Sequence, residues 1–175
     1  TTDQLVEDDE TVVVTLVSTD SADVTVDQAG KEATVTITDN DVAQVSIAAT
    51  TQAAEDATDG LFTLTTTKQF QAAVTVNLTV GGTATNGTDF TTIGTTVVFP
   101  ASSDTTTIAV DVTTDQFVEA DETVVVTVVD TSDVDVTAAA GPNNVATVTI
   151  TDNDAAEISI AATTQAAEDT TDGLF

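Results

Sequence analysis

The 175-residue sequence contains no cysteine, histidine, tryptophan, tyrosine or methionine, and only two basic residues. Without cysteine, the chain can form neither a disulfide scaffold nor a thiolate zinc site. Without histidine, it also lacks the imidazole ligand of most transition-metal sites and the base of the usual serine nucleophile system. Any metal chemistry must therefore use oxygen ligands, which suit hard cations such as Ca²⁺ and Mg²⁺.

The near absence of basic residues leaves the chain strongly acidic, with 30 Asp and Glu residues and a formal net charge of −28. Nucleic acids and anionic membrane surfaces bind clustered Lys and Arg, so neither is expected as a partner. Self-repulsion of this size destabilises a compact chain unless counter-ions bind to it. The chain is nevertheless expected to fold, because 41% of its residues are hydrophobic and alternate in strand-like patterns.

No apolar run approaches the roughly 18 residues of a membrane-spanning helix, so membrane insertion is not expected in this segment. The sequence starts with Thr and without a charged-then-apolar leader. We therefore expect a mature piece or an internal segment of a longer protein.

The sequence repeats itself with a period of about 112 residues. "TTDQLVEDDETVVVTLV" at residues 1–17 returns as "TTDQFVEADETVVVTVV" at residues 113–129, and "TVTITDND" at 34–41 returns at 147–154. The match continues into "SIAATTQAAED" at residues 46–56 and 159–169. A period of about 112 residues is typical of one domain. We interpret the chain as the C-terminal part of one repeat, a complete repeat and the N-terminal part of the next: residues 1–42, 43–154 and 155–175.

Within one period, hydrophobic and polar residues alternate as in half-buried strands, and no helical period persists. The expected strands include residues 45–49, 62–64, 72–80, 97–99, 108–112, 124–129 and 148–150. About seven short strands separated by Gly and Asn-Gly turns predict an all-β sandwich. Because there are only six Phe residues, its core is expected to consist mainly of Val, Ile, Leu and Ala.

Acidic residues gather in three loops of the complete repeat. Glu55 follows the first strand, and Asp152 and Asp154 follow the last strand. The third loop, residues 113–121 (the acidic loop), precedes the sixth strand and is copied as residues 1–9. In a sandwich these loops can meet at the pole from which the next repeat departs, where a calcium ion would turn their repulsion into binding.

A salt-adapted acidic surface is the alternative for any single acid. Asp8 becomes Ala120 and Gln44 becomes Glu157 between copies, so surface acids drift. The clustered acids recur instead: Asp3, Glu7, Asp9, Glu10, Asp39, Asp41, Glu55 and Asp56. This recurrence favours calcium, with Glu168 as the counterpart of Glu55 in the next repeat.

Four stretches resemble the Calx-β domain: "TDQFVEADETVVVTV", "GGTATNGTDF", "VVFPASSDTTTIAVDV" and the closing "TITDND". The resemblance implies an immunoglobulin-like sandwich of a kind found in sodium/calcium exchangers and large bacterial surface proteins. By this resemblance the calcium ligands would be Glu55, Asp115, Glu119, Glu122, Asp152 and Asp154, with the preceding repeat offering Asp3, Glu7, Glu10, Asp39 and Asp41. Asn153 stands where many exchanger domains have a third aspartate, which leaves the number of ions open. Asp89 is expected to be structural, in an Asx-type turn.

We expect a structural role outside the cell, as a calcium-stabilised segment of a secreted or cell-surface adhesin stalk or extracellular filament. The alternative is a calcium-sensing regulatory module. The expected partners are neighbouring repeats of the same chain, and an assembly in which neighbouring chains supply missing strands stays open. No enzymatic role is expected, because "GGTATNG" lacks the Lys of a phosphate loop and the carboxylates lack a Trp or Tyr platform for a sugar. Lys68 is expected to be solvated.

Overall fold

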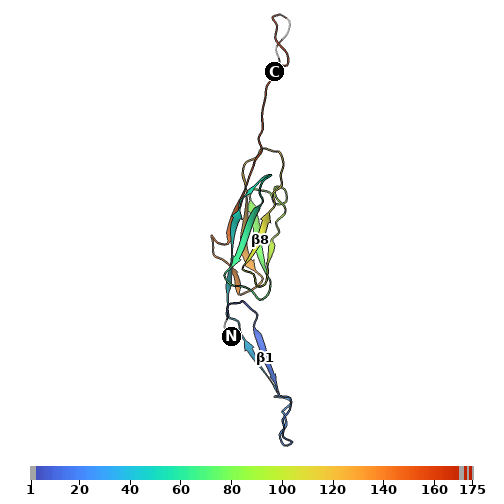
Figure 1. Cartoon of the computed structure of the whole chain (residues 1–175), viewed down its shortest axis with the longest axis vertical. Helices are drawn as coiled ribbons and strands as arrows, with labels where there is room; N and C mark the ends of the chain where they lie inside the picture. The colour runs from blue at the N-terminus through green and yellow to red at the C-terminus, as the bar shows by residue number, and fades with distance from the viewer. Residues whose placement is uncertain (1–2, 170–171, 173, 175) are drawn as a thin grey trace.

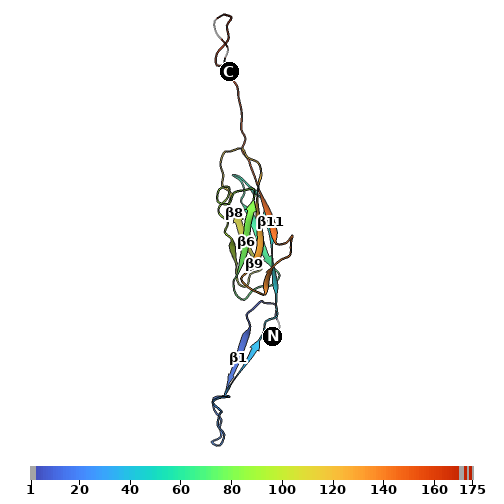
Figure 2. The same ribbon diagram turned by 180° about the vertical axis from the view of Figure 1, so that it is seen from behind.

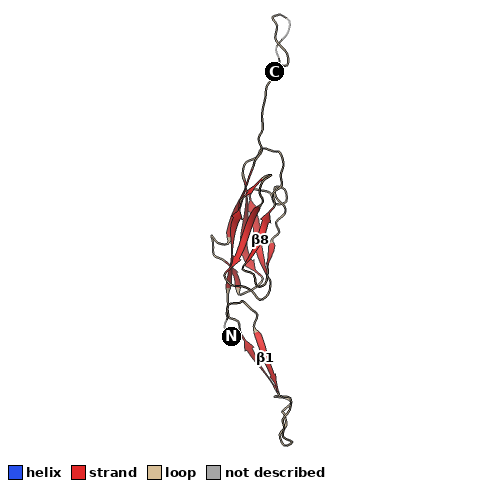
Figure 3. Cartoon of the chain, in the orientation of Figure 1, coloured by secondary structure: helices blue, strands red, loops and turns tan. Residues whose placement is uncertain are grey.

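The computed structural model describes residues 3–169, 172 and 174, and it is long and thin (Figure 1). A β-sandwich lies in the middle, a separate two-stranded hairpin at one end and an extended C-terminal segment at the other, and the view from behind agrees (Figure 2). All regular structure in the described residues is strand (Figure 3). None of these residues forms a helix long and apolar enough to cross a membrane.

The sandwich consists of two sheets, which confirms the all-β prediction. The first sheet has the order β10 (Val136–Ala138), β3 (Ala43–Thr51), β5 (Gly60–Thr66) and β8 (Thr105–Val110). The second has the order β4 (Ala53–Ala54), β11 (Val145–Thr151), β9 (Glu122–Thr131), β6 (Val74–Gly82) and β7 (Thr96–Phe99). The pairs β10–β3 and β11–β4 are parallel and the others antiparallel. Strands β4 and β10 were not predicted, since two or three residues are too few to show an alternation.

The core lies between the two sheets and contains the expected Val, Ile, Leu and Ala side chains. Its largest fully buried side chains, however, are those of Phe62, Phe70, Phe90 and Phe99. Phe70 packs edge-on against Phe99, with ring centroids 5.3 Å apart and an interplanar angle of 71°. This is a geometry that aromatic pairs prefer. Few aromatic residues thus still supply the bulk at the centre of the core.

The hairpin at the N-terminal end repeats the local structure of β9 and β11. Strand β1 (Glu10–Thr15) pairs antiparallel with β2 (Glu32–Ile37), and Glu10 lies opposite Ile37 just as Glu122 lies opposite Ile150. Val12 and Val14 are exposed, whereas their counterparts Val124 and Val126 are fully buried. The copied sequence therefore forms the same hairpin without a second sheet against its apolar face. The division of the chain after residues 42 and 154 stays a prediction.

Candidate metal centres at the two ends of the sandwich

At the C-terminal pole, the sheet topology brings Glu55 beside the end of β11. Strand β4 runs parallel to β11, with Ala53 opposite Ile150 and Ala54 opposite Thr151. The next amide, that of Glu55, donates to the carbonyl oxygen of Thr151 at 3.1 Å. Asn153 Nδ2 in turn donates to the carbonyl oxygen of Glu55 at 3.0 Å. Asn153, the uncharged residue of "DND", thus connects the segment that carries Glu55 to the segment that carries Asp152 and Asp154.

Three of the predicted ligands converge closely enough to share an ion. One carboxylate oxygen each from Glu55, Asp152 and Asp154 lies within 4.8 Å of the others. Among the described residues, Glu55 Oε2 and Asp154 Oδ2 are buried and have no hydrogen-bond partner. Buried polar atoms are normally paired, so two unpaired carboxylate oxygens at one point call for a cation. The donor set, oxygen only and anionic, fits a hard cation such as calcium.

The acidic loop contributes two further carboxylates. Burial raises the pKa of Glu55, as do the negative charges of Asp152, Asp115, Asp154 and Glu119, in decreasing order. Burial also raises the pKa of Asp154, together with the charges of Asp152, Asp115 and Asp56. Mutual repulsion therefore defines one group, here called the C-terminal site: Glu55, Asp115, Glu119, Asp152 and Asp154.

Asp152 also positions the acidic loop. Its Oδ2 accepts a hydrogen bond from the amide of Glu119 at 3.1 Å, and its Oδ1 accepts one from the amide of Asp154 at 3.3 Å. Asp115 Oδ1 accepts a hydrogen bond from the amide of Phe117 at 2.7 Å, which closes a local turn. Both aspartates therefore shape the loop as well as supplying charge.

Glu122, the sixth predicted ligand, lies next to Asp89. Burial raises the pKa of Glu122, and so do a hydrogen bond to Asp89 and that residue's charge. Asp89 Oδ2 accepts a hydrogen bond from the amide of Thr85 at 2.6 Å, which agrees with a structural role in its turn. The pairing of these two acids was not expected from the sequence. It sets Glu122 apart from the three converging carboxylates.

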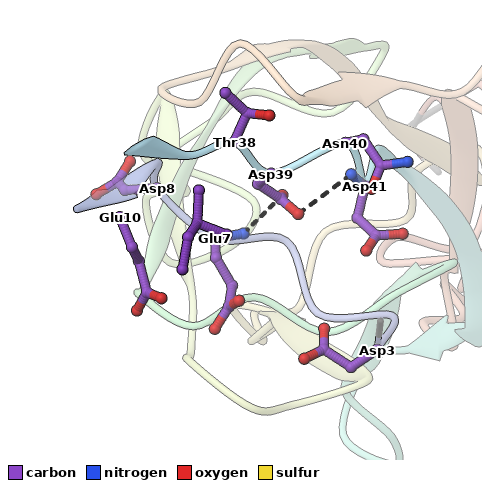
Figure 4. Close-up of a pocket in the computed structure, with 9 residues that line it drawn as sticks. Asp3, Glu7, Asp8, Glu10, Thr38, Asp39, Asn40 and Asp41 are labelled. Carbon is purple, nitrogen blue, oxygen red and sulfur yellow. Dashed lines mark hydrogen bonds between the residues drawn. The ribbon is translucent and has the colours of Figure 1, made fainter. Parts of the chain in front are cut away.

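The copied acids at the opposite end form a second group around a cavity of about 400 Å³ (Figure 4). The carboxylates of Asp3, Glu7 and Asp41 face a common space, whereas Asp8 points away from it. The cavity is lined by Asp3, Glu7, Asp8, Glu10, Ile37, Thr38, Asp39, Asn40 and Asp41. The name N-terminal site is used below for Asp3, Glu7, Asp39 and Asp41.

The N-terminal site repeats the hydrogen bonds of the C-terminal one. Asp39 Oδ2 accepts from the amide of Glu7 at 3.0 Å, and its Oδ1 accepts from the amide of Asp41 at 3.3 Å. Asp3 Oδ1 accepts from the amide of Leu5 at 3.1 Å. These are the counterparts of the bonds made by Asp152 and Asp115. The same hydrogen bonds are thus built twice from the duplicated sequence, although among the described residues only Glu55, Asp152 and Asp154 bring their carboxylate oxygens within 4.8 Å of one another.

Glu7 and Asp39 respond differently to their surroundings. Burial raises the pKa of Glu7, and the charges of Asp3, Glu10, Asp39 and Asp41 raise it further. The amide of Glu7 is the main cause that lowers the pKa of Asp39, with smaller contributions from two other amides and Lys68 outweighing the effect of burial. Asp39 is therefore held as an anion beside a carboxylate that resists ionisation.

Lys68, from the loop between β5 and β6, forms an ion pair with Asp41. The expectation that Lys68 would be solvated was wrong, because the loop that carries it lies against the N-terminal site. Glu168, the remaining predicted ligand, is exposed on the extended C-terminal segment and belongs to neither site.

The N-terminal acidic loop is also clamped to the sandwich. The amide of Val6 donates to the carbonyl oxygen of Gln69, and the amide of Gln71 donates to that of Val6, both at 3.0 Å. The Val6 side chain joins the hydrophobic core, and Gln71 Nε2 donates to Glu7 Oε1 at 2.8 Å. This seam contact, Val6 against residues 69–71, joins the N-terminal acidic loop to the sandwich and was not predicted.

In metal-free protein, the free energy of unfolding is expected to rise as the pH falls through the raised pKa values of the site carboxylates towards the ordinary value of 4.5 for Glu. Glu7, Glu55, Glu122 and Asp154 have raised pKa values, so the folded state binds protons more readily than the unfolded state. Their stabilising effect is complete below the ordinary values of 4.5 for Glu and 3.8 for Asp and is lost as the pH rises through the raised values. The lowered pKa of Asp39 opposes this only near and below 3.8.

Urea unfolding in a chelator at several pH values checks this prediction. With saturating calcium the trend should reverse, because a metal ion requires deprotonated carboxylates. A metal-free stability that decreases steadily as the pH falls towards 4.5 would contradict the raised pKa values.

Comparison with known proteins gives a consistent set of matches. The family model of the Calx-beta domain matches residues 1–41 and 42–154. The apo-form Calx CBD1 domain superposes with a TM-score of 0.54 and 22% identity, covering 65% of this chain and all of that one. CBD12 from CALX1.2 gives 0.52 and 23%, covering 63% of this chain and 44% of that one. The calcium binding domain CBD12 of CALX1.1 gives 0.50 and 23%, covering 62% and 44%.

At these identities the solved structures bear on the fold alone. No curated protein sequence matches the chain at a significant level.

Proposed function

The chain belongs to the Calx-beta domain family, and we propose that it is a calcium-binding repeat segment in which the ion fixes each repeat to the next. The observation that carries this proposal is the pair of buried oxygens of Glu55 and Asp154, which lie within the converging carboxylates and have no hydrogen-bond partner in the part of the chain that the structure describes. A surface adapted only to salt has no need to withdraw such oxygens from water.

Calcium would be held at the C-terminal pole by Glu55, Asp152 and Asp154, with Asp115 and Glu119 of the acidic loop nearby. At the other end Asp3, Glu7, Asp39 and Asp41 would hold a second ion. The ion supplies positive charge that offsets the repulsion between these carboxylates. Asp152 and Asp39 have a second task, since each keeps its acidic loop in place through a backbone amide.

The proposed stiffening follows from what else the N-terminal carboxylates touch. Asp41 pairs with Lys68, Glu7 accepts from Gln71, and Val6 beside Glu7 packs into the sandwich core. An ion that gathers Glu7 and Asp41 therefore holds a loop whose other side is attached to the following repeat. Loss of the ion would let the carboxylates move apart and loosen the contact.

We further propose that the segment belongs to an adhesin stalk or filament outside the cell. Close duplication of the repeat and the net charge of −28 favour a polymer-like exterior protein. The junction after Asp154 contains no Gly, Ser or Pro linker before Ile158. Extracellular modules commonly bind calcium at about 10⁻⁴–10⁻³ M, which matches calcium levels outside cells.

Small-angle scattering tests the stiffening. In calcium, the chain should behave as one elongated body, and in a chelator the hairpin should move relative to the sandwich and broaden the distribution of dimensions. Magnesium at the same ionic strength controls for screening. Identical scattering in calcium and in the chelator would contradict the proposal.

A calcium-sensing module is the second candidate, and the comparisons fit it at least as well. One solved structure that shares the fold is named as the calcium binding domain CBD12 of CALX1.1, a name that fits a module that binds calcium. The two readings differ in affinity, because a sensor inside the cell works at about 10⁻⁷–10⁻⁵ M. Calorimetric titration of the chain with calcium separates them, since micromolar saturation favours the sensor and submillimolar to millimolar saturation favours the stalk.

A further inference from the structure

The two copies of the acidic loop differ in what covers their apolar residues. Val6 is 3% exposed, whereas Val118, its counterpart, is 57% exposed and the neighbouring Phe117 is 69% exposed. The two loops differ at only two positions, Leu5 against Phe117 and Asp8 against Ala120, and the valine itself is the same in both. The difference comes from the sandwich that follows the first copy.

Three features of the loop between β5 and β6 receive Val6. The carbonyl oxygen of Gln69 and the amide of Gln71 form a parallel bridge with the Val6 backbone, and Phe70 lies between them in the core. Residues 69–71 thus offer one backbone acceptor and one backbone donor, with the buried side chain of Phe70 between them. This segment accepts one apolar residue presented in an extended conformation.

The second copy of the loop already has the shape needed to present Val118. Asp115 holds the amide of Phe117 and Asp152 holds the amide of Glu119, as Asp3 and Asp39 do around Val6. Both bonds are formed within the same repeat, so they hold the residues on both sides of Val118 before another repeat docks. A surface preformed in this way loses little conformational freedom on docking.

We propose that Phe117 and Val118 form a docking surface for the repeat that follows in the chain. Val118 would pair with the backbone at the counterparts of residues 69–71, as Val6 does here. Another molecule of this chain is the poorer occupant, because its own residues 69–71 are already covered by Val6. The inference rests on the tandem arrangement in the proposed function, but it does not require bound calcium.

The test completes the next repeat from the chain's own sequence, by joining residues 63–154 after residue 175. Hydrogen exchange then compares the amide of Val118 with that of Val6 in the same molecule. The Val118 amide should exchange about tenfold or more slowly than in the unextended chain, because it gains a backbone acceptor. Exchange at Val118 that stays as fast as before, beside a protected Val6, would overturn the proposal.

Folding of the added repeat is checked at the amide that corresponds to Val126. If that amide is unprotected, a second extension, residues 1–154 followed directly by residues 42–154, reproduces the junction sequence of the existing seam and serves for the same comparison.

A matched substitution separates docking from loop structure. Val118→Asp should leave the unfolding midpoint of the unextended chain unchanged and should abolish the new protection in the extended one. Val134→Asp is the control, since Val134 is also exposed and lies outside the acidic loop. Equal exchange at the Val118 position in both extended variants would overturn the proposal.

Calcium titration of the same extended chain keeps the two proposals distinct. Protection at Val118 without calcium binding would leave docking standing and remove the proposed ion. Calcium binding with Val118 still unprotected would do the reverse.

Discussion

Calcium at about a thousandfold above its dissociation constant is expected to raise the free energy of unfolding by about 4 kcal/mol for each site filled. Only the folded chain brings Glu55, Asp152 and Asp154 within 4.8 Å, so the unfolded state has no equivalent site. Urea unfolding with calcium and with a chelator, at constant ionic strength, measures the difference. If sodium at the same ionic strength stabilised the chain as much as calcium does, the acids would be a salt-adapted surface and not a calcium site.

The double substitution Asp152→Asn and Asp154→Asn should remove most of the calcium effect at the C-terminal site. Asn has nearly the size of Asp, so the change removes charge rather than volume. Asp20→Asn with Asp23→Asn is the control, because it removes the same charge from exposed residues outside both sites. Equal calcium stabilisation in the two double variants would contradict the assignment of ligands.

The long strands could be predicted because apolar and polar residues alternate along each of them. In β6, Val74, Val76 and Leu78 are buried and alternate with polar residues, so the period of two is visible in the sequence alone. Strands β1 and β2 carry the duplicated sequence of β9 and β11 and form the same hairpin. Strand β4 could not be found in this way, since its two residues belong to a sheet only because β11 lies beside them.

The part of the C-terminal site that depends only on which loops lie at the same pole of the sandwich could be predicted from the sequence. Three loops at one pole of a sandwich were enough to expect Glu55 near Asp152 and Asp154. The pair Asp89–Glu122 and the ion pair Asp41–Lys68 depend on how separate loops fold against each other, which no local pattern records.

One signal for the seam contact was present in the sequence. Val6 recurs as Val118, each beside a second apolar residue, Leu5 or Phe117, in a loop rich in acids, where a fully solvated loop does not need apolar residues. The structure gives the valine a partner in one copy and leaves it exposed in the other. An apolar residue that recurs at a junction of repeats is therefore a sign of contact between them.

Phe70→Ala is expected to lower the free energy of unfolding by about 3–5 kcal/mol. Phe70 is 1% exposed, packs edge-on against Phe99 and lies between the two residues whose backbone holds Val6. Truncation therefore removes core volume. It also removes the buried side chain that lies between the two backbone groups bonded to Val6. Urea unfolding measures the first effect, and hydrogen exchange at the Val6 amide measures the second.

Phe62→Ala is the matched control, because Phe62 is fully buried in β5 and pairs with Ala49 and Ile108 away from the seam. Both variants should lose similar global stability, yet only Phe70→Ala should speed exchange at Val6. That amide is expected to open locally, at a free energy below that of global unfolding, so a weaker core alone leaves its exchange unchanged. If both variants speed exchange at Val6 equally, the seam opens only when the whole sandwich unfolds, and Phe70 does not link the two repeats.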